Sequence, residues 1–127
     1  TKREAPGFQP EGSVTVLEVL RATRTLLTPR QAWTKGANAK RKTRGSCPAT
    51  DFDACCWCLN GAFLRVTGGN EALMDAASTA CFRTLSPPQR RYSWNLIMWN
   101  DAAGRRHAQV LALLDRTIAR LEGEGEA

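Results

Sequence analysis

The chain has 127 residues, of which 43% are hydrophobic and 24% charged, and its net charge is +6. A chain of this length fits one domain and can bury a core without disulfides or structural metals. No apolar run approaches the roughly 18 residues of a membrane-spanning helix. The N-terminal residues also lack the apolar stretch of a secretory signal. We therefore expect a protein without a membrane partner.

The positive charge is concentrated in one segment. Residues 30–50 contain six Lys or Arg side chains and no acidic residue. In the rest of the chain, basic and acidic residues are equal in number. The whole imbalance therefore lies in this segment, where an anionic partner would be attracted.

The first predicted element follows a flexible lead-in. Residues 1–12 contain two prolines and two glycines, which favour turns over regular structure. Apolar residues then recur at helical spacing from Val16 to Leu27. Ser13 is expected to cap this helix, and Pro29 closes it.

Residues 30–50 predict a long basic loop. They lack apolar periodicity and include Gly36, Gly45 and Pro48. Trp33 is expected to anchor the loop to the core. Loops of this length are uncommon in compact domains, where they tend to be functional or disordered.

A second helix is predicted to begin shortly after the basic loop. Thr50 and Asp53 have the spacing of a capping box, and Gly68-Gly69 would end the helix. The expected apolar stripe of this helix consists of Cys55, Cys58, Leu59, Ala62, Phe63 and Val66.

The second half of the chain predicts further helices. Asn70 is expected to cap a third helix, which Pro87-Pro88 stop. Residues 92–99 are too apolar for either periodicity to dominate; we favour a short buried helix, with a strand as the alternative. The pattern over residues 110–121 is the clearest helical repeat in the chain.

These elements predict an all-α fold, a compact bundle of four to five short helices with one long basic loop. The helical domain would span residues 13–121, with the loop at 30–50 and a frayed tail at 122–127. The expected core residues are Leu20, Leu59, Phe63, Leu73, Trp99, Leu111 and Leu114.

The basic loop is the main candidate for a binding site. Clustered cations neutralise phosphates, and this effect dominates non-specific affinity for nucleic acids. The alternative is a solvated, mobile loop, since charge alone fixes no partner, and no helix-turn-helix, RNP or zinc-finger spacing is present. The candidate nucleic-acid-binding residues are Lys35, Lys40, Arg41, Lys42 and Arg44.

The five cysteines indicate a reducing compartment. Their number is odd and three are crowded into four positions, unlike a disulfide framework. We therefore expect a cytoplasmic protein whose cysteines are small apolar core residues, and no cofactor. The alternative is a structural zinc or thiol site, with the candidate ligands Cys47, Cys55, Cys58 and Cys81.

The sequence carries no enzymatic signature. His107 is the single histidine, and its place at the start of the last helix suggests a capping or solvent-exposed role. A nucleophilic Cys–His pair is an open alternative. Because the hydrolase, metalloprotease and Walker motifs are absent, we favour a non-enzymatic protein.

The step Trp99-Asn100-Asp101 is a further motif. Asn100 or Asp101 can cap a helix by accepting backbone N–H groups, with Trp99 packed beneath. The functional alternative pairs Asp101 with Arg105 in a polar groove. We favour the structural role.

Several short motifs together resemble a known family. Trp33-Thr34-Lys35-Gly36, Cys58-Leu59-Asn60-Gly61-Ala62, Trp99-Asn100-Asp101 and the final helix are similar to a domain of unknown function found in small bacterial and phage proteins. The resemblance covers roughly residues 13–121. It implies an accessory protein without assigned catalytic residues, and Gly61-Ala62 suggest a helix packed closely on a neighbour.

We therefore predict a non-enzymatic accessory or binding module whose loop at residues 35–44 contacts nucleic acid or another polyanion. One alternative is a protein-interaction module or homodimer that uses exposed aromatic residues such as Trp57, Tyr92 or Trp94. Such a module would show an apolar surface patch and a mass that depends on concentration. The other alternative is the small zinc or thiol domain.

Overall fold

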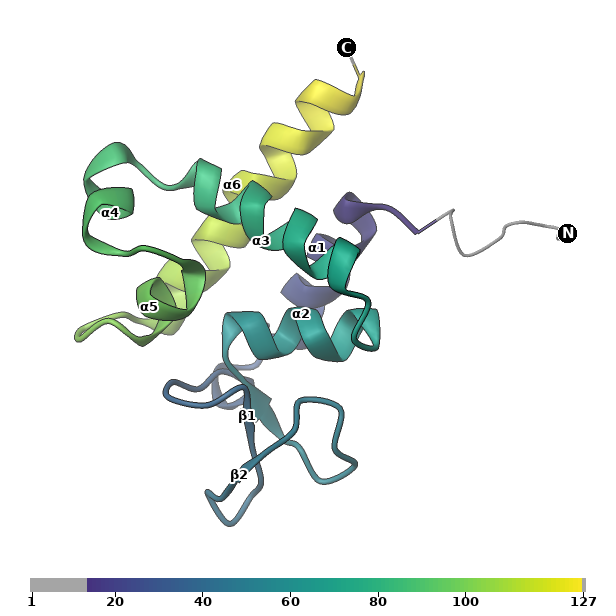
Figure 1. Cartoon of the computed structure of the whole chain (residues 1–127), viewed down its shortest axis with the longest axis vertical. Helices are drawn as coiled ribbons and strands as arrows, with labels where there is room; N and C mark the ends of the chain where they lie inside the picture. The colour runs from purple at the N-terminus through teal and green to yellow at the C-terminus, as the bar shows by residue number, and fades with distance from the viewer. Residues whose placement is uncertain (1–13, 127) are drawn as a thin grey trace, which may run out of the picture.

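The computed structural model describes residues 14–126 and is mostly helical (Figure 1). The predicted lead-in at residues 1–12 and the predicted cap Ser13 lie outside the described residues. Six α-helices and one 3-10 helix are present in this part of the chain: α1 (Val16–Leu26), η2 (Arg30–Ala32), α2 (Leu59–Thr67), α3 (Glu71–Thr84), α4 (Pro87–Tyr92), α5 (Leu96–Asp101) and α6 (His107–Glu126).

The all-α prediction is wrong in one respect, because a small antiparallel sheet lies within and just after the predicted loop. Its strands are β1 (Ala39–Lys40), β2 (Ser46–Cys47) and β3 (Cys56–Trp57), in the order β2-β1-β3. Ala39 pairs with Cys47 on one side and with Trp57 on the other. Strands of two residues are too short to show an alternating pattern in the sequence.

The predicted start of the second helix is also wrong. Residues 50–55 form turns, in which Asp51 Oδ1 accepts the Asp53 N–H at 2.7 Å. The helix begins at Leu59, after β3, and the Cys58 Sγ accepts the Gly61 N–H at 3.2 Å as its N-cap. Thr50 and Asp53 therefore cap no helix.

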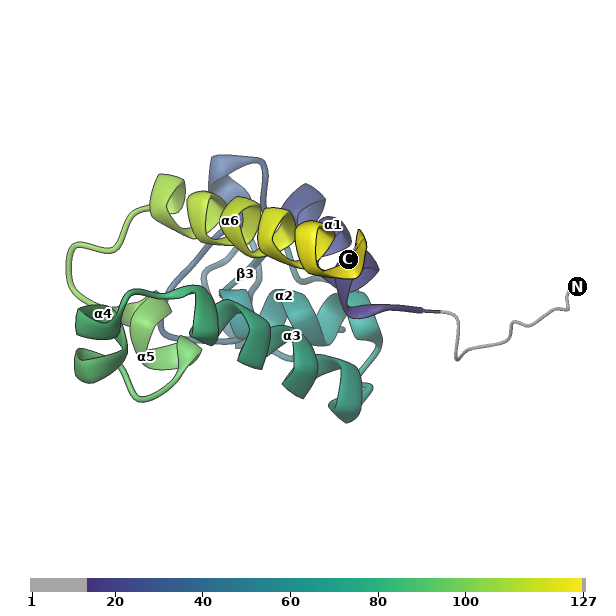
Figure 2. The same ribbon diagram turned by 90° about the horizontal axis from the view of Figure 1, so that it is seen from above.

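The helices α1, α3 and α6 enclose the core together with α2. Figure 2 shows α6 alongside α1, with α2 and α3 on the other side of the core. Thr15 caps α1 through a capping box with Glu18. In the last helix, the apolar positions predicted from residue 110 onward face inward.

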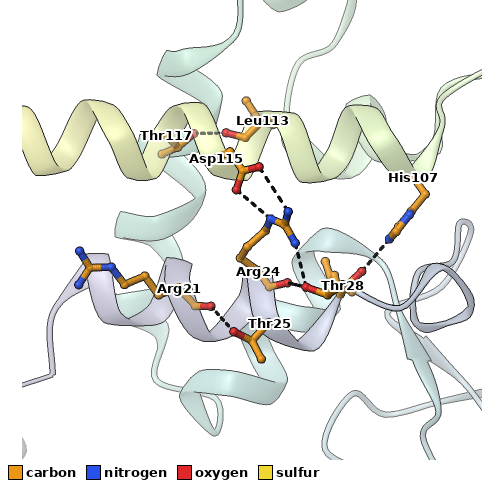
Figure 3. A network of polar contacts seen from close by, with 9 residues as sticks. Arg21, Arg24, Thr25, Thr28, His107, Leu113, Asp115 and Thr117 are labelled. Atoms are coloured by element: carbon orange, nitrogen blue, oxygen red, sulfur yellow. Dashed lines mark hydrogen bonds and ion pairs between the residues drawn. The ribbon is translucent and has the colours of Figure 1, made fainter.

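Polar contacts hold α6 against α1 (Figure 3). The Arg24 Nε donates to Asp115 Oδ1 at 2.8 Å, across 91 residues of sequence. At the start of α6, the His107 Nε2 lies 2.7 Å from the Leu27 carbonyl oxygen. His107 is half-buried, so it joins two elements and is not the exposed residue that the sequence suggested.

The region after α3 contains two short helices. Pro87 and Pro88 start α4, which Ser86 caps, where the sequence suggested only the end of α3. The short helix predicted near residues 92–99 is present as α5, beginning later because Asn95 is its N-cap.

The core matches most of the predicted residues. Leu20, Leu59, Phe63, Trp99 and Leu114 are buried, whereas Leu73 and Leu111 are partly buried at its edge. The last helix continues through residues 122–126, the segment predicted as a frayed tail; the division of the chain into lead-in, domain and tail stays a prediction. Among the described residues, no helix is both long enough and apolar enough to cross a membrane.

Candidate nucleic-acid interface

The basic segment folds into a β-hairpin. Strands β1 and β2 are joined by a tight turn, in which the Arg41 N–H donates to the Gly45 carbonyl at 2.9 Å and the Arg44 N–H to the Arg41 carbonyl at 2.8 Å. Arg44 has a left-handed backbone with φ of 76°, a conformation that is costly for a residue with a side chain. The turn leaves Lys42, Thr43 and Arg44 exposed at its tip.

Two of the five predicted binding residues are held by internal contacts. The Arg41 guanidinium donates to Asp51 Oδ2 at 3.1 Å and to the Ser46 carbonyl at 2.9 Å. The Lys35 Nζ donates to the Ala102 carbonyl at 2.8 Å, away from the hairpin. Their contacts support the fold, and the role of these two cations in binding stays a prediction.

The other three predicted cations belong to the hairpin. Lys42 and Arg44 are exposed and Lys40 is half-buried. Within residues 14–124, no carboxylate forms an ion pair with any of the three. Lys40, Lys42 and Arg44 therefore carry the unneutralised charge of this region.

An exposed aromatic side chain lies beside Lys42. Phe52 is 97% exposed, the most exposed of the large hydrophobic residues that the structure describes. It shares a surface cavity of about 450 Å³ with the hairpin. The residues that line this cavity are Arg41, Lys42, Thr43, Phe52, Asp53, Ala54 and Cys55.

Phe52 was missed from the sequence because the predicted helix included it. Its neighbours Asp51 and Asp53 and the preceding Pro48 are typical of a turn, which was the available signal. We name Lys40, Lys42, Arg44 and Phe52 the hairpin surface. It combines cations with an exposed aromatic ring; of its residues, Lys42 and Phe52 line the cavity, in which Asp53 is the single carboxylate.

The cysteines proposed as zinc ligands lie in different environments. Cys55 and Cys56 follow the hairpin, and their sulfurs lie 3.5 and 3.9 Å from the Lys40 carbonyl oxygen. Burial raises the pKa of the Cys58 thiol, and it raises the pKa of the Cys81 thiol to about 12. In the described part of the chain, no group of three or more His, Cys, Asp or Glu residues is placed to hold a metal ion.

The three short motifs of the sequence meet at Asn100. This side chain is fully buried, and its Oδ1 accepts from Trp33 Nε1 at 2.7 Å and from the Leu59 N–H at 3.1 Å. Its Nδ2 donates to the Thr34 carbonyl at 3.2 Å. Asn100 therefore lies in the last turn of α5 and links three segments. It is not an N-cap residue in sequence, but it accepts the N–H of Leu59, the first residue of α2.

Asp101 and Arg105 do not form the predicted pair. The Asp101 Oδ1 accepts the Gly36 N–H at 3.1 Å and the Asn100 Nδ2 at 2.9 Å. The Arg105 Nε donates to the Trp99 carbonyl at 2.8 Å, and its guanidinium carbon lies 4.1 Å from the Trp99 ring centroid. Asp101 thus stabilises the loop before β1, and Arg105 stabilises the loop after α5.

Comparison with known proteins identifies one family. The family described as "Family of unknown function (DUF6197)" matches residues 12–120. No curated protein and no solved structure matches the sequence.

Proposed function

The chain belongs to this family of unknown function, and we propose that it is a non-enzymatic accessory protein that binds single-stranded nucleic acid through the hairpin surface. The supporting observation is the position of Phe52, 97% exposed, in the same cavity as Lys42. An aromatic ring next to cations is the combination with which proteins bind single strands, because the ring stacks on a base while the cations neutralise the backbone.

The chemistry of the hairpin surface fits a single strand better than a duplex. Unpaired bases stack on aromatic rings, each such contact contributing about 1–3 kcal/mol, and neighbouring cations neutralise the backbone. In a duplex the bases are already stacked on each other, so Phe52 would have no base to contact. The phosphates of a single strand or of a duplex would be neutralised by the same three cations, Lys40, Lys42 and Arg44.

The hairpin is also held in shape before any ligand arrives. Arg41 clamps the turn through its bonds to Asp51 and to the Ser46 carbonyl. A surface already fixed in its bound form loses less conformational entropy on binding. This favours direct binding by Lys42 and Arg44 without folding of the loop.

The first test is a titration of fluorescently labelled single- and double-stranded DNA and RNA at several salt concentrations, measured by anisotropy. The variant K42Q/R44Q should reduce the slope of log K against log salt by about 1.4, because each phosphate contact on a single strand contributes about 0.7. The variant F52A should weaken binding by roughly 5- to 150-fold with little change in the slope.

The matched control is R83Q/R116Q, which removes two exposed cations from α3 and α6. Its binding should stay close to that of the wild-type protein. Equal loss in both double variants would indicate attraction by net charge alone and contradict the assigned surface. Single-strand binding that is unaffected by F52A would reduce the proposal to a polyanion site.

The protein-interaction alternative rests on a different face. Tyr92 and Trp94 are 80% and 82% exposed, and Ile97 and Met98 nearby are also exposed. Trp57, which the sequence offered for this role, is only 6% exposed and donates to the Ala49 carbonyl at 2.9 Å. We retain this candidate as a second function, with a homodimer or a protein partner covering Tyr92 and Trp94.

We also propose a cytoplasmic location and a bacterial or phage source. The five cysteines are all unpaired thiols, as is usual in a reducing compartment. The source depends on the family resemblance of the sequence motifs. The zinc or thiol domain stays a prediction that elemental analysis of the purified protein would test.

A further inference from the structure

A second basic cavity lies at the start of α6, apart from the hairpin surface. It has a volume of about 500 Å³, within the usual range of small-molecule sites. None of its lining residues carries a carboxylate. These residues are Arg30, Trp33, Arg105, Arg106, His107 and Ala108.

Arg105 enters this cavity as a fixed donor. Its Nε donates to the Trp99 carbonyl and its plane lies against the Trp99 ring, which holds the guanidinium in place. Within residues 14–124, neither Nη1 nor Nη2 has a hydrogen-bond partner. Because burial lowers the pKa of Arg105, a bound anion would offset the cost of keeping this charge partly out of water.

Two further arginines surround the same space. Arg30 and Arg106 are exposed, and no carboxylate in the described part of the chain forms an ion pair with either. Three guanidinium groups around one cavity repel each other, and two of them stand beside the positive end of the helix dipole of α6. An anion in the cavity would offset the repulsion between the guanidinium groups and would itself be attracted to the positive end of the helix dipole.

The other walls of the cavity are firmly positioned. Trp33 is fixed by its bond to Asn100, and His107 by its contact with the Leu27 carbonyl. The two rings lie with centroids 6.3 Å apart. The three arginines therefore line a space whose aromatic walls are held in place before a ligand binds, which lowers the entropic cost of binding.

We propose that this cavity binds a phosphate monoester, with Arg105 as the fixed guanidinium and Arg30 and Arg106 closing on the remaining oxygens. Arginine matches the geometry of phosphate with paired N–H donors. The phosphate has two sources with the same chemistry, a free nucleotide or the terminal phosphate of a nucleic acid. The inference is independent of the proposed function, because the hairpin surface shares no residue with this cavity.

The test is calorimetric titration of the full chain with 5′-AMP and with adenosine, which lacks the phosphate. We expect 5′-AMP to bind at least about tenfold more tightly than adenosine. The variant R30Q/R106Q should lower the affinity for 5′-AMP by tenfold or more. Both substitutions are at exposed positions, and circular dichroism would check that the fold is retained.

Two controls assign the binding to the cavity. R83Q/R116Q and the hairpin variant K42Q/R44Q should both bind 5′-AMP as the wild-type protein does. Because K42Q/R44Q removes only the hairpin cations, failure of one proposal is distinguishable from failure of the other. The inference is overturned if adenosine binds as tightly as 5′-AMP, if R30Q/R106Q binds normally, or if K42Q/R44Q abolishes 5′-AMP binding.

A second pair of probes separates the two sources of phosphate. An oligonucleotide with a 5′-phosphate is compared with the same oligonucleotide ending in a 5′-hydroxyl. Tighter binding of the phosphorylated form, lost in R30Q/R106Q, would support recognition of a nucleic-acid end. Equal binding of the two oligonucleotides together with specific binding of 5′-AMP would support a free nucleotide.

Discussion

At the scale of single residues, Asn100 has the most demanding role. Its amide joins the segments that contain Trp33, Thr34 and Leu59, and each of its two polar atoms serves two partners. Only an amide offers both donors and an acceptor in this shape. The side chain therefore fixes the relative positions of three stretches that are far apart in the sequence.

The substitution N100D should destabilise the protein by about 3 kcal/mol or more, measured by urea unfolding. The new carboxylate would be buried beside Asp101, and the Thr34 carbonyl would lose its donor. The matched control is N95D, because an aspartate at this exposed N-cap of α5 still accepts the Met98 N–H. An unfolding free energy for N100D within about 0.5 kcal/mol of N95D would contradict this role.

The sequence drew attention to Trp99-Asn100-Asp101 but not to what these residues contact. Asn100 reaches Leu59 across 41 residues and Trp33 across 67 residues. Local spacing contains no information on contacts of this range. Phe52 was missed for a different reason, because the apparent capping box at Thr50 and Asp53 outweighed the local turn signal of its neighbours.

At the scale of elements, the start of α2 lies directly on the loop before β1. A Cβ on Gly61 would stand 1.8 Å from the Asn38 carbonyl oxygen, which is backbone and cannot move aside easily. The same carbonyl accepts the Cys58 N–H at 3.2 Å. The sequence predicted close packing of Gly61-Ala62 on a neighbour, and for Gly61 this neighbour is the loop before β1.

The substitution G61A should therefore destabilise the fold by about 3 kcal/mol or more, because the methyl group overlaps the backbone. The control is G123A in α6, where a Cβ meets no atom within 4 Å. That change should stabilise the helix by about 0.5–1 kcal/mol. Thermal unfolding should show a lower melting temperature for G61A and a higher one for G123A than for the wild-type protein. A G61A protein as stable as the wild type would refute the close contact.

Elements with a long apolar repeat were predictable, and short ones were not. The helices α1, α3 and α6 follow the 3.6-residue period over three or more turns. The helix α4 has only six residues, and its first two are prolines. In a sequence, such a proline pair indicates the end of the preceding helix α3 as well as the start of a new helix. The strands β1, β2 and β3 form only because they meet each other, so their pairing is a tertiary event.

At the scale of the whole molecule, α3 and α6 close the core around Cys81. This side chain is fully buried, and the Thr117 hydroxyl and Arg120 of α6 face it. Burial raises the pKa of its thiol to about 12, which outweighs the opposing effects of Thr117 and Arg120. The folded protein thus keeps this thiol protonated at pH values where an unfolded chain would ionise it.

The stability of the protein should therefore fall as the pH rises from about 9 toward 12. An exposed thiol ionises near its ordinary pKa of about 8.5, so in this interval the unfolded state has fewer protons than the folded state and is favoured by each rise in pH. The variant C81A should lose this contribution. Urea unfolding at a series of pH values gives the free energy of unfolding as a function of pH. If this free energy falls with pH as steeply in C81A as in the wild-type protein, Cys81 is not the source of the effect.

The pairing of α1 with α6 has a consequence for the order of folding. His107 and its partner Leu27 are 80 residues apart. Because α1 packs on α6 as well as on α2 and α3, the inner face of α1 is covered completely only after α6 has been made. At about 5–20 residues per second, a ribosome needs on the order of 4–16 s to synthesise the intervening chain. During that time the part of α1 that packs on α6 stays open to other apolar surfaces, and chaperone binding or aggregation competes with completion of the core.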